Sequence, residues 1–156
     1  MPYKTLLFMT KPTMPKNIVL YADDDSDDLE LVQESFSLYS NNVEVITVPD
    51  GSQALSYLHR LTDNDPTPCL IILDINMPVI NGKDVLKKIR ELNRFESVPV
   101  VLFTTSSLPM DEMFAKKYNA GFVTKPLDVA QMEMITEVFI DHCADEIRKN
   151  ISKRIR

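Results

Sequence analysis

Glycine is scarce in this chain of 156 residues: three occur, at positions 51, 82 and 121, and they are far apart. Glycine-rich loops bind phosphate groups because clustered glycines allow the backbone to come close to the ligand. No such cluster exists here. The sequence therefore excludes both a P-loop and a dinucleotide-binding fingerprint.

Cysteine and histidine are also scarce, with two residues of each. Cys69 falls in a predicted strand and Cys143 in a helical pattern, so we expect two core thiols rather than a disulfide or a metal-binding pair. His59 and His142 are far apart in the sequence, which argues against a zinc cluster. For both histidines we expect packing or surface roles.

The chain lacks any run of the roughly 20 apolar residues that a membrane-spanning helix needs. The apolar part of its first 16 residues is too short for a convincing signal peptide. We therefore expect a cytoplasmic protein with no membrane association. The composition, 44% hydrophobic and 26% charged residues, suits one globular domain with an adequate core.

Charge is unevenly distributed along the chain. Residues 148–156 carry five basic side chains and no acidic one, so residues 1–147 carry a net charge of −11, against −6 for the whole chain. Such an acidic body repels nucleic acid, and no direct DNA binding is expected. We expect residues 148–156 to form a basic helix end or tail. Asp27 and Asp28 fall in the first turn of a predicted helix, where negative charge is favoured, and a structural role is expected for them.

Apolar strand-like runs alternate with amphipathic helical patterns, which predicts an α/β domain with a doubly wound, mainly parallel five-stranded sheet and helices on both faces. The last helical pattern predicts one long helix from about Asp128. The methionines of the last two helices are expected to fill the core. The predicted strands are 17–22, 43–48, 70–74, 98–103 and 121–124, and the buried positions of the last helix are Met132, Ile135, Phe139, Cys143 and Ile147.

The most apolar strand ends in a carboxylate, in the stretch CLIILDINMPVING. A strand that is apolar at every position is typical of a parallel sheet buried on both faces. Ligands bind at the carboxyl ends of such strands, which makes Asp74 a candidate site residue. Asp is also a common turn residue beside Pro78 and Gly82, so this stretch alone leaves both interpretations open.

Other strands end in polar residues as well. The first is followed by three aspartates, the fourth ends in Thr104, and Lys125 follows the fifth. Parallel strands bring these ends to one edge, where several carboxylates would repel each other unless a cation lay among them. A few hard oxygen ligands suit Mg²⁺, which retains positions for water and phosphoryl oxygens. Lys125 could pair with an anionic group, and Thr104 offers a hydroxyl donor.

Four segments in order, YADDDSDD, LDINMPVING, LFTTS and FVTKP, resemble the receiver domains of two-component response regulators. The resemblance covers about residues 16–147 and leaves residues 1–15 as an N-terminal extension. Because the chain ends soon after the last motif, we expect a stand-alone receiver. The resemblance implies a flavodoxin-like fold with strand order 2-1-3-4-5, which the alternation of elements does not by itself establish.

The resemblance also assigns roles to individual residues. Asp74 matches the phosphoacceptor, and Lys125 matches the lysine that pairs with the phosphoryl group, before a peptide bond to Pro126 that is characteristically cis in this family. Thr104 matches the hydroxyl residue that moves toward the phosphoryl group. Phe122 matches an aromatic position whose rotamer reports the phosphorylation state to partners.

The same resemblance implies the Mg²⁺ ligands. Asp23 and Asp24 match the acidic pair of the family, Asp74 contributes its own carboxylate, and the backbone carbonyl of Asn76 matches the third protein ligand. Three consecutive aspartates also permit Asp24 and Asp25 as the pair. Alignment of the preceding run IVLYA favours Asp23 and Asp24, since Asp25 also suits the N-cap of the next helix.

The function implied is acceptance of a phosphoryl group from a phosphohistidine of a sensor histidine kinase or a histidine phosphotransfer protein. A receiver would catalyse only its own phosphorylation and dephosphorylation. A downstream protein would bind the face formed by the fourth helix, fifth strand and fifth helix. Two alternatives remain open: a phosphorylation-independent adaptor, which would be expected to lose part of the Asp, Thr and Lys set, and a haloacid-dehalogenase-like phosphatase, which needs a second Asp where this chain has Asn76.

Overall fold

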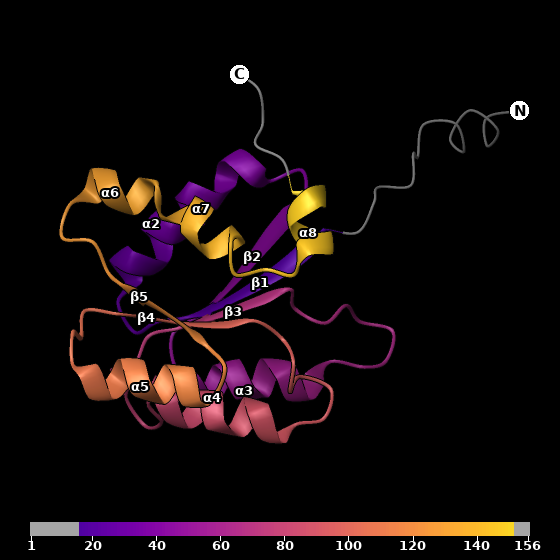
Figure 1. Cartoon of the computed structure of the whole chain (residues 1–156). Helices are drawn as coiled ribbons and strands as arrows, with labels where there is room; N and C mark the ends of the chain where they lie inside the picture. Colours follow the sequence, from indigo (N-terminus) through magenta and orange to yellow (C-terminus); the bar gives the residue numbers. More distant parts are fainter. Residues whose placement is uncertain (1–15, 152–156) are drawn as a thin grey trace, which may run out of the picture.

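A parallel sheet forms the centre of the structure, a computed structural model that describes residues 16–151 (Figure 1). Its strand order is β2-β1-β3-β4-β5, and each neighbouring pair is parallel. This confirms the predicted flavodoxin-like fold and its strand order. The strands are β1 (Asn17–Ala22), β2 (Val43–Val48), β3 (Leu70–Leu73), β4 (Val100–Thr104) and β5 (Gly121–Thr124).

Helices cover both faces of this sheet (Figure 1). On one face lie α3 (Gly51–Arg60), α4 (Gly82–Glu91) and α5 (Pro109–Lys117). On the other lie α2 (Ser26–Phe36), α6 (Val129–Glu133), α7 (Ile135–Ile140) and α8 (Asp145–Asn150); a 3₁₀ turn at Ser37–Tyr39 continues α2. None of the helices between residues 16 and 151 combines the length and apolar character that crossing a bilayer requires.

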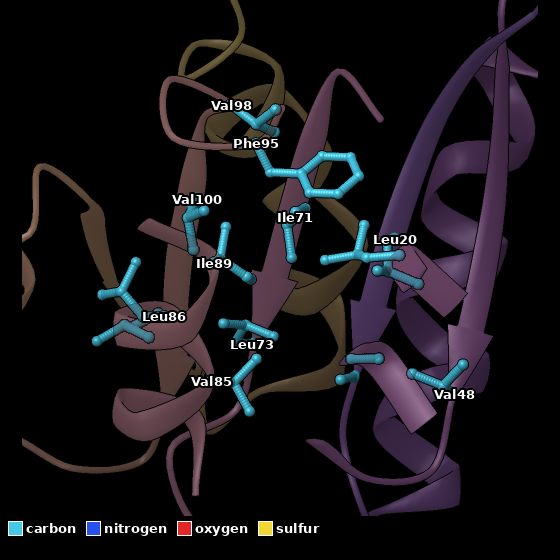
Figure 2. Packing of buried hydrophobic residues seen from close by; sticks show 14 of the residues in the cluster. Leu20, Val48, Ile71, Leu73, Val85, Leu86, Ile89, Phe95, Val98 and Val100 are labelled. Atoms are coloured by element: carbon cyan, nitrogen blue, oxygen red, sulfur yellow. The ribbon is translucent and has the colours of Figure 1, made fainter. Parts of the chain in front are cut away.

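The sheet divides the hydrophobic core in two because successive strand residues point to opposite faces. In β3, Ile71 and Leu73 pack under α3 and α4, a cluster seen in Figure 2, whereas Leu70 and Ile72 pack toward α2 and α7. All four side chains are fully buried. A strand with helices on both sides has no exposed face, which explains why β3 is apolar at every position.

The end of the chain differs from the single long helix that the sequence predicts. The helical path is divided into α6, α7 and α8, and the backbone at Ala144 is extended, with ψ of 148°. At Met134 the amide donates to the carbonyl three residues earlier, in the 3₁₀ manner. The spacing of Met132 and Ile135 fits either kind of turn, so apolar periodicity could not reveal the break. The expected inward face is otherwise present: Met132, Ile135, Phe139 and Cys143 are buried and Ile147 packs against them.

The prediction that the methionines of the last helices fill the core is wrong for three of them. Met110, Met113 and Met134 are 69–74% exposed, and only Met132 is buried. Helix α5 turns Asp111 and Ala115 inward, which leaves Met110 and Met113 on its outer surface. The side of the molecule that carries α5 therefore presents apolar groups to solvent.

The two cysteines are core thiols, as predicted. Cys143 is buried in the cluster on the α2 side of the sheet, Cys69 packs against the same cluster, and both are free. The ring of His142 packs on Gly121 so closely that a Cβ there would lie 2.5 Å from the ring. The predicted extension, residues 1–15, and the last part of the basic end, residues 152–156, lie outside the described residues.

Candidate functional site

Four of the predicted site residues meet at the carboxyl edge of the sheet. Asp23 follows β1, Asp74 follows β3, Thr104 ends β4 and Lys125 follows β5. Backbone hydrogen bonds hold these residues in the extended ladder: the Asp74 amide donates to Ala22 at 3.0 Å, and the Lys125 amide donates to the Thr104 carbonyl at 2.7 Å. The parallel topology therefore brings together residues that are about a hundred positions apart in the sequence.

The loop that follows Asp74 is held by a close backbone contact. A Cβ built on Gly82 would lie 2.1 Å from the Asp74 carbonyl oxygen, so only glycine fits at the start of α4. The Gly82 amide donates to the carbonyl of Ile75 at 2.9 Å, and the Asn81 side chain caps the helix by accepting from the Asp84 amide. This packing fixes the backbone that carries the acceptor carboxylate.

Asp23, Asp24 and Asp74 form a compact group of carboxylates. One oxygen from each lies within 4.8 Å of the others; Asp23 and Asp74 are buried and Asp24 is exposed. Burial and, after it, the negative charge of Asp23 raise the pKa of Asp74 to about 7, although Lys125 partly opposes the shift. Three carboxylates crowded together in this way are a donor set that fits a hard divalent cation.

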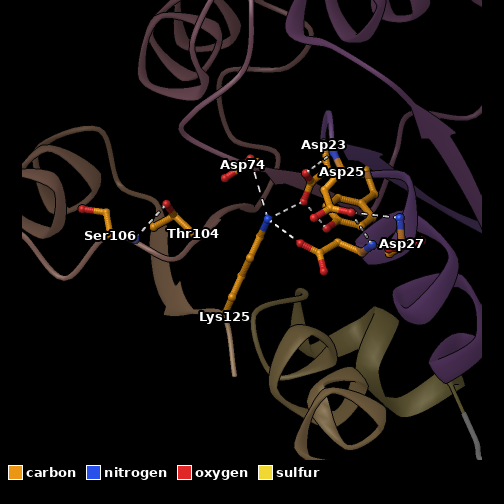
Figure 3. Close-up of polar contacts among 9 residues, drawn as sticks. Asp23, Asp25, Asp27, Asp74, Thr104, Ser106 and Lys125 are labelled. Atoms are coloured by element: carbon orange, nitrogen blue, oxygen red, sulfur yellow. Dashed lines mark hydrogen bonds and ion pairs between the residues drawn. The ribbon is translucent and has the colours of Figure 1, made fainter. Parts of the chain in front are cut away.

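The Lys125 ammonium lies among the acidic side chains (Figure 3). Its Nζ is 2.7 Å from Asp23 Oδ2, 2.8 Å from Asp28 Oδ2 and 3.7 Å from Asp74 Oδ2. Burial alone would lower the pKa of Lys125, but its hydrogen bonds with Asp23 and Asp28 outweigh this effect and raise it. The lysine therefore stays charged at neutral pH.

Asp23 is fixed by several donors. Besides Lys125, the hydroxyl of Tyr21 donates to Oδ2 at 2.5 Å, and the Asp25 amide donates to Oδ1 at 2.9 Å. Burial and the nearby Asp23 charge raise the pKa of Tyr21, so its hydroxyl remains a donor. The sequence offered no signal for this role, because Tyr21 is one of several apolar or aromatic residues in β1.

The three consecutive aspartates have different surroundings. The Asp25 carboxylate caps α2 by accepting from the amides of Asp27 at 2.9 Å and Asp28 at 3.3 Å. Its carboxylate is thus engaged by the helix, and it is not part of the carboxylate group described above. This geometry favours Asp23 and Asp24 over Asp24 and Asp25 as a metal-binding pair.

Asp28 does more than the helix-end role predicted for it, because it binds Lys125. The first-turn position was recognised from the sequence, but its spatial consequence was not. Helix α2 begins only four residues after β1, at the same edge of the sheet as the other site residues. A side chain in its first turn can therefore reach the site.

Thr104 connects the site to α5. Its Oγ1 is buried and accepts from the Ser106 amide at 3.2 Å, and the Ser106 hydroxyl donates to Asp111 at 2.5 Å. Asp111 also pairs with Lys83 of α4 at 2.8 Å. The sequence indicated neither Asp111 nor Lys83. Phe122 is half-buried and packs against the core on the same side as α5.

Asn76 and Pro126 are the remaining predicted positions at the site. The backbone amide of Asn76 donates to the Asp74 carboxylate, and its side chain is exposed. No peptide bond between residues 16 and 151 is cis, so the expectation of a cis bond before Pro126 is wrong for this structure. The trans isomer is the lower in energy for most X-Pro bonds, by about 0.5–1 kcal/mol.

Comparisons with known proteins agree with this architecture. The model of the family described as response regulator receiver domain matches residues 19–137. Response regulator Rcp1 of Synechocystis is 34% identical over 100 residues, which cover 63% of this chain and 68% of Rcp1. Among solved structures, the phosphorylated cyanobacterial phytochrome response regulator RcpA has a TM-score of 0.76 at 27% identity, over 85% of this chain and 96% of that one. The Mn²⁺-bound form of Rcp1 has a TM-score of 0.71 at 29% identity, over 80% and 91%.

The fold and the site together define a class: parallel α/β domains with carboxylates and a lysine at the carboxyl edge of a five-stranded sheet. Since the family model covers most of the chain and the sequence relatives agree, this chain belongs to the response regulator receiver domain family of two-component signalling.

The raised pKa of Asp74 predicts a pH dependence of stability without divalent cations. The unfolded chain loses its Asp74 proton near pH 3.8, whereas the folded protein keeps it until about pH 7. The folded state thus binds the extra proton between these values, and its stability falls as pH rises through this window, by at most about 1.4 kcal/mol per pH unit. Asp74→Asn should remove this decline. In EDTA, the free energy of unfolding of Asp74→Asn minus that of the native protein should therefore increase from pH 4 to pH 7.

Chemical denaturation at several pH values measures this difference. Asp63→Asn, an exposed loop variant, controls for the loss of one carboxylate and should follow the native pH profile. A difference between Asp74→Asn and the native protein that stays constant from pH 4 to 7 would show that Asp74 titrates normally.

Proposed function

We propose that this receiver domain accepts a phosphoryl group on Asp74 from a phosphohistidine of a sensor histidine kinase or histidine phosphotransfer protein. The observation that carries the proposal is the position of the buried Asp74 carboxylate, beside two further carboxylates and 3.7 Å from the Lys125 ammonium. A cytoplasmic location and a receiver domain over residues 16–147 fit this function.

Asp23, Asp24 and Asp74, with the backbone carbonyl of Asn76, would hold Mg²⁺. Their oxygen donors are the kind that Mg²⁺ prefers, and the related response regulator Rcp1 has been solved in an Mn²⁺-bound form. When bound, the ion supplies the positive charge that keeps Asp74 ionised and neutralises phosphoryl oxygens.

The transfer itself needs little from the protein beyond position and charge. A carboxylate oxygen of Asp74 attacks phosphorus as the nucleophile; the new O–P bond forms as the P–N bond to the donor imidazole breaks, and the bond electrons leave with that nitrogen. Lys125 stays protonated and offers its charge to the arriving phosphoryl oxygens. The structure of the phosphorylated relative RcpA supports this chemistry in the family.

Thr104 would transmit the effect of phosphorylation from the site to α5. Its hydroxyl is drawn toward a phosphoryl oxygen, which breaks its contact with the Ser106 amide and disturbs the bonds from Ser106 to Asp111 at the start of α5. Phe122 on β5 then turns inward. Phosphorylation thus biases an element with two arrangements instead of moving the domain as a whole.

The partner surface is proposed on α5, β5 and the beginning of α6. Several apolar side chains in α5, at the start of α6 or just before these helices are more than half exposed, and exposed apolar patches often mark protein–protein contacts. They are Leu108, Met110, Met113, Leu127 and Val129. A downstream protein would distinguish the two states by the arrangement of this surface.

The two alternative functions find less support. A haloacid-dehalogenase-like phosphatase needs a general acid at position 76, where the side chain is an amide. A phosphorylation-independent adaptor needs none of the buried charge at the site, yet Asp74, Thr104 and Lys125 are all present and close together. Unchanged partner binding by Asp74→Asn would favour the adaptor.

The proposed acceptor can be tested by intact-mass spectrometry. Acetyl phosphate with Mg²⁺ should add one phosphoryl group to the native protein, and Asp74→Asn should add none because the nucleophile is gone. Asp63→Asn, which removes an exposed carboxylate, should behave like the native protein. A single adduct on Asp74→Asn, mapped to another residue, would refute the assignment.

The switch role of Thr104 predicts a separation of transfer from response. Thr104→Ala should still be phosphorylated on Asp74, but the change in amide hydrogen exchange across residues 104–125 should shrink, because one lost hydrogen bond weakens the coupling by about 1–3 kcal/mol. Thr105→Ala changes the neighbouring exposed threonine and should retain the full response. If Thr104→Ala responds like the native protein, Thr104 is only a loop residue.

A further inference from the structure

Lys125 is shared between the acceptor and a residue outside the predicted site. An ammonium group has three N–H donors. Two of them are engaged by Asp23 at 2.7 Å and Asp28 at 2.8 Å, whereas the Asp74 oxygen lies at 3.7 Å, beyond hydrogen-bond range. In this arrangement the lysine is held on the α2 side of the site.

The contact from Asp28 is built into the fold. Helix α2 is anchored to the end of β1 because Asp25 caps its first turn and the Asp25 amide donates to Asp23. Asp28 is thereby placed against Lys125, and the pair is mostly removed from water: the two side chains are 19% and 7% exposed. The attraction within a pair so shielded is screened little by salt.

Asp23 and Asp28 differ in the hydrogen-bonding partners that each would keep if Lys125 moved away. Asp23 belongs to the carboxylate group proposed to hold Mg²⁺, and it keeps donors from Tyr21 and Asp25 if the lysine moves. Asp28 lies outside that group, and Lys125 is the only hydrogen-bonding partner of its carboxylate among residues 16–151. The Asp28 carboxylate therefore affects the site mainly through its hydrogen bond with Lys125.

We propose that Asp28 is a positioning residue that competes with the phosphorylated acceptor for Lys125. This inference rests on the function proposed above. A phosphoryl group on Asp74 must attract Lys125 against the pull of Asp28, and the negative charge of Asp28 also disfavours a further anion nearby. Asp28 thus lowers the affinity of the site for the phosphoryl group and sets how readily the phosphorylated arrangement forms.

The neighbouring residue supplies a matched control. Asp27 lies in the same turn, carries the same charge and is exposed, and its carboxylate makes no contact with Lys125. Asp28→Asn and Asp27→Asn therefore change the net charge and the helix end equally. Of the two variants, Asp28→Asn is the one that changes the residue hydrogen-bonded to Lys125.

The test measures binding of beryllium fluoride, a mimic of the phosphoryl group, in the presence of Mg²⁺. Asp28→Asn should bind this anion about five- to tenfold more tightly than the native protein, a factor that corresponds to roughly 1–1.4 kcal/mol. Asp27→Asn should change the affinity less than twofold. Equal effects of the two variants, or weaker binding by Asp28→Asn, would overturn the inference while leaving the acceptor role of Asp74 intact.

A second measurement asks whether the effect passes through the lysine. In the metal-free protein, the shift in denaturation midpoint caused by Asp28→Asn should differ between the native background and Lys125→Gln, where the partner of Asp28 is absent and only the effect on the helix end remains. The same shift in both backgrounds would show that Asp28 acts only on its helix. If the native protein itself binds no beryllium fluoride, the proposed function fails, and the competition fails with it.

Discussion

The placement of one buried lysine against an excess of carboxylates is the interaction on which this site depends. Lys125 offers a single positive charge, whereas Asp23, Asp28 and Asp74 all approach it, and Asp24 lies beside them. Burying charges is costly unless each has partners, and here the negative charges outnumber the positive one. Burial and, after it, the negative charge of Asp23 raise the pKa of Asp74, and the same crowding of carboxylates makes the site suitable for a cation.

The hydrophobic core holds these charges in position. Tyr21, which donates to Asp23, packs edge-on against Phe103 with ring centroids 6.2 Å apart, and Phe103 packs against Phe139 of α7 at 5.0 Å. The Lys125 ammonium lies 5.7 Å from the centroid of the Phe103 ring. The polar edge of the sheet therefore packs on aromatic side chains that are fully buried. Rigid packing of this kind holds Asp74 and Lys125 in fixed relative positions.

Much of the fold could be predicted from the sequence because its signals are local. Strands β1, β2 and β5 have the predicted bounds, since apolar runs flanked by turn residues define them. The strand order came from the family resemblance, because alternation of elements does not determine which strands are neighbours. The breaks between α6, α7 and α8 were missed because apolar spacing is similar in 3₁₀ and α turns. The contact of Asp28 with Lys125, like that of Lys83 with Asp111, joins residues distant in sequence, which no local pattern reports.

Thermal denaturation with increasing Mg²⁺ tests most directly whether the excess of carboxylates makes a cation site. A ligand that binds only the folded state stabilises it, by about 2.7 kcal/mol at a concentration one hundred times its Kd. We expect the native protein to gain stability with Mg²⁺, more at pH 8 than at pH 5 because Asp74 must be ionised, and Asp23→Asn/Asp24→Asn to gain little at either pH. An equal gain in the native protein and the double variant would contradict the assignment of this edge of the sheet as the metal site.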